Sequence, residues 1–276
     1  MFDDLIHVFV PRTYKLSNGK IVKEKVSKSP YIIIILILMV IGCGKIVGFN
    51  FSQLIKRGHF FFDMLKKMFP CNWSYWPMMK KAMLDTIIMS ILGSVIGCVV
   101  ALPVSFFLSA NFKISKVITV SSRIVITLFR TLPIMVFACF FQLLFGMGTF
   151  TGTLAISVFT FTICTKMMYE YIETVDMGAY EAIQSTGASR IKCIWTSIWL
   201  QVKGYFFSTV LLTLETNVKS ASILGYVGAG GIGIVLDSQL SLRKYSNLGL
   251  VVLVMTLTVV ALEFLARYGR RKLSDV

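Results

Sequence analysis

Six long apolar runs, separated by polar segments, most strongly constrain how this chain can fold. The first run, residues 31–49, reads YIIIILILMVIGCGKIVGF and contains one charged residue, Lys45. At about 1.5 Å per residue, a helix of this length matches the thickness of a bilayer. The pattern predicts an all-α membrane protein with about six transmembrane helices. The other five runs lie at about residues 83–108, 124–147, 149–169, 204–226 and 248–266.

The composition also favours a fold that faces lipid. Hydrophobic residues make up 56% of the 276 residues and charged residues 15%, whereas a soluble domain has about 45–50% and about 25%. This excess of apolar side chains cannot all be buried in the core of a soluble domain. We therefore expect the bilayer to be the main partner of the surface.

The net charge of +15 is typical of a membrane protein whose basic loops stay in the cytoplasm, so we expect no nucleic-acid partner. With the N-terminus in the cytoplasm, the predicted inside segments hold most of the basic residues, and both termini lie inside. The first outside loop is an exception to this rule, because residues 56–81 contain six basic side chains.

We predict three segments along the chain. Residues 1–30 form a cytoplasmic basic tail, and residues 31–81 form the first transmembrane helix and an aromatic-rich, interfacial extracytoplasmic loop. Residues 82–276 form a five-helix core that includes a polar loop at 170–203. The six cysteines are widely spaced and only two histidines occur, so no zinc or haem spacing is present and we expect neither metal nor cofactor.

The polar loop has the spacing of a helical hairpin. It reads EYIETVDMGAYEAIQSTGASRIKCIWTSIWLQVK. Helical periodicity places Tyr180, Ile183, Gly187 and Ile191 on one stripe, and a glycine tolerates a sharp turn. We predict two short helices, joined near Gly187, that lie along the membrane surface.

Part of this loop, EAIQSTGASRIKCIWTSIWLQ, resembles the EAA loop of permease subunits in ABC importers. Glu181, Ala182 and Gly187 match the motif, and Ala188 and Ile191 follow within it. The resemblance implies a cytoplasmic coupling helix that docks into a separate ATPase subunit. The family has a proline where Leu200 stands, so we expect a straighter exit from the second helix.

Two further stretches extend the resemblance. RTLPIMVFA, residues 130–138, is similar to the Arg-x-x-Pro element of these permeases, and ETNVKSASILGYVGAGGIG, residues 215–233, is similar to phosphonate-importer permeases. Methionine-type permeases also contain Val-Gly-Ala-Gly-Gly, so a methionine-like or other small solute stays an alternative.

The resemblance implies a type I ABC importer permease (MetI-like) core in the bacterial cytoplasmic membrane. Its implied partners are a second copy of the chain, two ATPase subunits and an extracytoplasmic solute-binding protein. Its implied function is the import of a small anionic solute, a phosphonate or related phosphorus oxyanion, by alternating access. The chain has no G-x-x-x-x-G-K-[ST] motif, so we expect a transporter subunit that is no enzyme and takes its energy from the ATPase.

Candidate residues for the solute pathway lie within two apolar runs. Glu215, Asn217 and Lys219 interrupt the fifth run, where an ionisable side chain costs at least about 2.5 kcal/mol. Glu215 and Lys219 can form a structural i, i+4 pair, or Lys219 and Asn217 can face a water-filled path for an anion. Arg130 and Pro133 at the start of the third run indicate a snorkelling arginine and a proline kink, or a moving part of a gate.

The glycine-rich end of the fifth run permits a third function. Gly228, Gly230 and Gly233 fit the G-x-G-x-x-G pattern of an oxidoreductase that binds a dinucleotide. That site needs a preceding strand and an acid about 20 residues later, but the only acid close behind is Asp237 and the preceding residues have helical spacing. We interpret these glycines, with Gly231, as a flexible and tightly packed element near the outer mouth of a solute pathway.

Overall fold

The computed structural model describes residues 13–15, 19, 21–23, 29–112 and 115–274. The chain divides into two units, Met1–Asp63 and Met64–Val276. In the first unit, strand β1 (Thr13–Lys15) pairs antiparallel with β2 (Ile21–Lys23), a hairpin that the sequence did not predict. Most of the predicted basic tail lies outside the described residues. Helix α2 (Ser29–Ile46) corresponds to the first apolar run.

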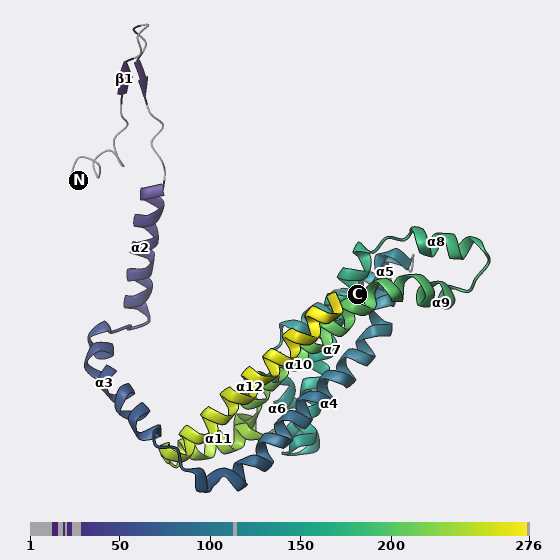
Figure 1. Ribbon diagram of the computed structural model, residues 1–276. Coiled ribbons are helices and arrows are strands. Elements are labelled where there is room, and N and C mark those ends of the chain that lie inside the picture. The colour runs from purple at the N-terminus through teal and green to yellow at the C-terminus, as the bar shows by residue number, and fades with distance from the viewer. Residues whose placement is uncertain (1–12, 16–18, 20, 24–28, 113–114, 275–276) are drawn as a thin grey trace. The chain divides into compact units, whose positions relative to one another are not determined.

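All other secondary structure in the described residues is helical. Helix α3 spans the boundary between the two units, and Figure 1 shows the order of the helices along the chain. Their bounds are α3 (Phe51–Met68), α4 (Trp76–Leu108), α5 (Lys116–Thr131), α6 (Ile134–Phe145), α7 (Thr149–Thr174), α8 (Gly178–Ser185), α9 (Arg190–Cys193), α10 (Trp199–Leu224), α11 (Ile232–Ser241) and α12 (Tyr245–Ser274).

The second unit is a helical bundle in which α4, α7, α10 and α12 run side by side (Figure 1). Helices α8 and α9 project at one end of this bundle, and α11 lies at the other end. Besides a small cluster of Leu108, Ile126 and Tyr169 that joins α4, α5 and α7, three buried clusters of described residues hold the bundle together. One joins α4, α7, α8 and α10, the second joins α4, α6, α7 and α10, and the third joins α4, α11 and α12.

Glycines bring α4 and α7 into close contact. A Cβ atom at Gly97 would lie 2.6 Å from the backbone oxygen of Ser157, and one at Gly93 would lie 2.5 Å from Cγ2 of Ile156. Small residues four apart allow membrane helices to pack backbone against backbone. The Gly93-x-x-x-Gly97 spacing in the sequence is the local pattern that indicates this contact.

The number of membrane spans agrees with the sequence when bent helices are counted as single spans. Three described helices are long and apolar enough to cross a membrane alone, and three bent pairs bring the number to six. The prediction of one helix over 124–147 was wrong, because α5 and α6 meet at 90°. Leu132 and Pro133 are both extended, since proline disfavours helical backbone at the residue before it.

Candidate functional site

The predicted coupling segment, residues 178–193, is a helical hairpin. Helix α8 ends at Ser185, the chain turns, and α9 begins at Arg190. Gly187 has φ +82°, a left-handed conformation that glycine adopts without the strain of a side chain. Its N–H donates to the carbonyl of Gln184 at 3.0 Å. The prediction of helix, turn and helix is confirmed.

One face of the coupling segment is anchored and another is free. Tyr180 is buried, and its ring meets Phe112 edge-on with centroids 5.8 Å apart. Ile191 is 81% exposed, so the predicted stripe that joined it to Tyr180 was wrong, because the turn at Gly187 changes the helix direction. Of the predicted coupling residues, Glu181, Ala182, Gly187 and Ile191 are exposed and Ala188 is half-buried.

The second helix of the hairpin is not short. From Arg190 the chain stays helical to Val227, passing through a π-helical turn at Ile194–Ile198 directly into α10. This agrees with the straighter exit expected from Leu200 in place of proline, because proline removes a backbone donor and breaks a helix. Helices α9 and α10 are therefore parts of one continuous helix, so a movement of α9 also moves α10.

The charged residues of α10 form a cluster with a partner that the sequence did not indicate. Lys219 Nζ donates to Glu215 Oε1 at 2.9 Å, and Arg270 Nη2 of α12 donates to Glu215 Oε2 at 3.4 Å. The side chain of Glu215 is 11% exposed and that of Lys219 is 45% exposed. Arg270 Nη1 is buried without a hydrogen-bond partner. The cluster therefore holds two cations and one carboxylate.

Asn217 lies apart from this cluster. Its Nδ2 donates to Ser94 Oγ of α4 at 2.8 Å and to Thr160 Oγ1 of α7 at 2.7 Å, and the residue is 2% exposed. Buried polar groups of this kind link membrane helices. The structure places Asn217 and Lys219 on different faces of α10, because two residues along a helix point in nearly opposite directions.

Arg130 and Pro133 lie at the junction between α5 and α6. Both residues are exposed, and Pro133 directly precedes the first residue of α6. The predicted kink is thus a complete break in the helix. Neither residue contacts the charged cluster in the described structure, so the structure does not bring the predicted pathway residues together at one point.

The glycine segment packs tightly between α10 and α11. Gly228, Gly230 and Gly231 have φ values of +68°, +88° and +73°. The backbone of Gly233 approaches that of Gly225 and Ser222 so closely that a Cβ atom would not fit. The residues before the glycines are helical, where a dinucleotide site needs a strand. The fit to G-x-G-x-x-G is therefore only formal.

Residues 93–273 match the family of the binding-protein-dependent transport system inner membrane component. The chain belongs to this family of permeases. The matched part contains the coupling segment, the charged cluster and the glycine segment. Membership makes the chain a multi-pass inner-membrane component and implies an ATPase and a binding protein as partners.

Two curated relatives carry the names of transport permeases, not of enzymes. This permease is 32% identical over 200 residues to HtxC of Stutzerimonas stutzeri, named as a phosphite transport system permease protein, over 72% of this chain and 71% of HtxC. It is 29% identical over 191 residues to the phosphate-import permease protein PhnE of Mycolicibacterium smegmatis, over 69% of this chain and 36% of PhnE.

A solved structure of the inward-facing MetNI methionine ABC transporter has the same fold as this permease. The TM-score is 0.64 with 17% sequence identity, and the match covers 73% of this chain and 99% of that chain. At this identity the likeness shows the fold alone. The predicted type I, MetI-like permease fold is confirmed.

Proposed function

We propose that this permease forms the membrane pathway of an ATP-driven importer for a small phosphorus oxyanion, such as phosphite or a phosphonate. The observation that carries the proposal is the charged cluster of Glu215, Lys219 and Arg270. The names of the relatives HtxC and PhnE support the same class of solute. The solute enters from an extracytoplasmic binding protein and leaves into the cytoplasm.

Lys219 belongs to a face of α10 that no other part of the described chain covers. The residues of this face repeat every three or four positions, and all are exposed: Leu212, Thr216, Lys219 and Ile223 of α10, and Tyr226 of the 3₁₀ turn that follows it. A lysine that faced lipid here would cost about 2.5–3.5 kcal/mol. Contact of this face with water or with a second protein surface costs less free energy than contact with lipid.

A second copy of the permease provides that surface. In a dimer with two-fold symmetry the same face of each protomer meets across the axis. The two α10 faces would then line a path between the protomers, with one Lys219 on each side. Because each cluster holds two cations and one carboxylate, the path attracts anions.

The coupling segment is the contact for the ATPase. Glu181, Ala182, Gly187 and Ile191 are exposed at one end of the bundle, while Tyr180 holds α8 to the core. A force that the ATPase exerts on α9 also moves α10 and its charged face, because the helix is continuous from Arg190 to Val227. In this topology both termini and the coupling segment lie in the cytoplasm, and the binding protein approaches the end that carries α11.

The proposal predicts a specific effect of Lys219→Gln. We expect phosphite uptake to fall about tenfold, as expected for losing a charge-assisted hydrogen bond of about 1.5 kcal/mol to the anion. The amount of assembled permease stays unchanged, since Glu215 keeps Arg270. Uptake of radiolabelled phosphite, divided by the amount of permease in the membrane, measures the effect.

A matched control is Lys166→Gln. Lys166 also forms an i, i+4 pair, with Glu170 at 3.5 Å, but it lies on α7 and is not part of α10. It should change neither uptake nor assembly. If Lys219→Gln lowers uptake and assembly equally, the pair is structural and the anion path is wrong.

A further inference from the structure

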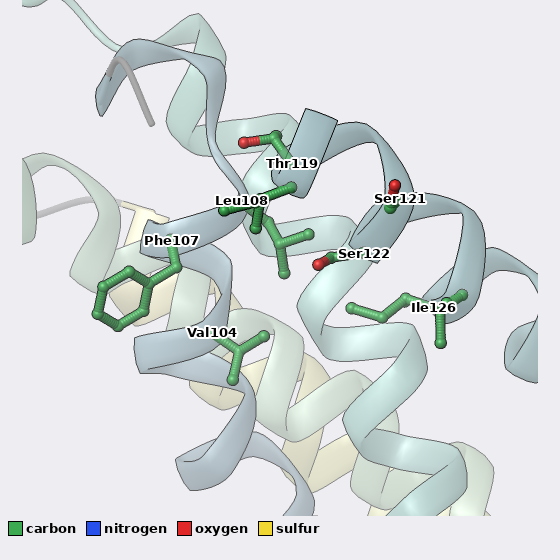
Figure 2. Close-up of a pocket in the computed structure, with 9 residues that line it drawn as sticks. Val104, Phe107, Leu108, Thr119, Ser121, Ser122 and Ile126 are labelled. Carbon is green, nitrogen blue, oxygen red and sulfur yellow. The ribbon is translucent and has the colours of Figure 1, made fainter. Parts of the chain in front are cut away.

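A groove lies between the end of α4 and the start of α5. Its volume is about 530 Å³, within the range of about 300–1,000 Å³ that ligand pockets occupy. Figure 2 shows the side chains of both helices around this space. The lining is mainly apolar and includes Val104, Phe107 and Leu108 of α4 and Ile118, Val125 and Ile126 of α5.

Arg123 fixes the position of α5 beside α4. Its Nε donates to the carbonyl of Leu108 at 2.9 Å, and its guanidinium also forms an ion pair with Glu173 of α7. The same group lies 4.5 Å from the ring centroid of Tyr169. These contacts join three helices, so the groove is a fixed feature of the fold.

Helix α5 has the pattern of a helix that lies in a membrane interface. Lys116, Arg123 and Arg130 repeat every seven residues, about two helical turns, and therefore share one side of the helix. The opposite side is mainly apolar and exposed, with Ile118, Val125 and Leu128 uncovered. Such helices bind anionic lipid surfaces through their basic side chains.

Helix α5 and the segments that flank it along the chain contain no acidic residue. Between Asp85 and Glu170 the sequence contains no aspartate or glutamate. Arg123 has Glu173, whereas within the described residues no salt bridge involves Lys116 or Arg130. The positive charge of Lys116 and Arg130 next to an apolar groove is suited to a ligand with an anionic head and an apolar tail.

We propose that the groove between α4 and α5 binds an anionic phospholipid. One acyl chain fills the groove, and the phosphate group is held near Lys116, one turn before Thr119, which lines the groove. A second copy of the permease is a poorer occupant, because a symmetric contact would bring two acid-free, basic α5 helices together.

The test uses the purified full-length permease and native mass spectrometry, with phosphatidylglycerol and phosphatidylcholine as probes. We expect tighter binding of phosphatidylglycerol, and Lys116→Gln should weaken it about fivefold, the factor for about 1 kcal/mol per basic residue. The control Lys80→Gln removes the same charge at the other end of α4 and should leave the affinity unchanged.

A second variant tests the groove itself. Ser122→Phe places a ring among the lining residues and should reduce binding of both lipids, while circular dichroism and gel filtration show an intact protein. Equal affinity for the two lipids would overturn the proposal, as would equal effects of Lys116→Gln and Lys80→Gln. A shift of Ser122→Phe from dimer to monomer with unchanged lipid binding would assign the groove to a second copy and also overturn it.

Discussion

Replacing Gly187 by valine is expected to reduce solute uptake to background while the permease still assembles. Gly187 has φ +82°, and a β-branched residue in the left-handed region costs about 1–3 kcal/mol. A Cβ atom here would meet no atom within 4 Å, so the core is not disturbed. The turn rearranges instead, and the exposed residues of α8 and α9 lose their arrangement for docking.

The variant Gly187→Asn tests whether the left-handed backbone conformation or the glycine itself is required. Asparagine adopts the left-handed region more readily than other residues, so this variant should keep most of the uptake. The measurement is uptake of labelled solute in cells, with the amount of permease determined in the same membranes. Uptake at the wild-type rate in Gly187→Val would show that the turn does not couple the permease to its ATPase.

The second large effect is expected at Gly230. A Cβ atom there would lie 2.8 Å from Thr149 Cγ2 and 2.9 Å from Thr149 Cα, and the residue has φ +88°. Strain and overpacking together cost about 2–6 kcal/mol for Gly230→Val. Because membrane proteins tolerate only a limited loss of stability, we expect little assembled permease and a matching loss of uptake.

Gly42→Val provides the comparison. Gly42 lies in α2, and a Cβ atom there meets nothing within 4 Å, so this variant should assemble normally. Thermal unfolding of the detergent-solubilised proteins gives the difference in stability. If Gly230→Val assembles normally but does not transport, the segment acts as a gate. If Gly230→Val both assembles and transports normally, the glycine segment is neither tightly packed nor a gate.

The apolar runs predicted the helices of the core well, because membrane spans are determined mainly by local hydrophobicity. The second run became α4, which begins seven residues earlier, and the fourth became α7, which ends five residues later. The break at Pro133 could not be predicted in the same way. A proline in a membrane helix produces either a kink or a full break, and the surrounding packing decides between them.

The candidate site was predicted only where it depends on local sequence. The hairpin around Gly187 and the pair of Glu215 with Lys219 both follow from short spacings. Arg270 is 55 residues from Glu215, and no local pattern joins them. The hydrogen bonds of Asn217 to α4 and α7 depend on how three helices pack, so no local pattern predicts them.

The most direct test of the account is ATP-driven uptake of radiolabelled phosphite by proteoliposomes that contain this permease, its ATPase and its binding protein. We predict accumulation that requires ATP and the binding protein, falls about tenfold with Lys219→Gln and disappears with Gly187→Val. Accumulation of phosphite without ATP would contradict the coupling. Accumulation of methionine instead of phosphite would contradict the proposed anion pathway.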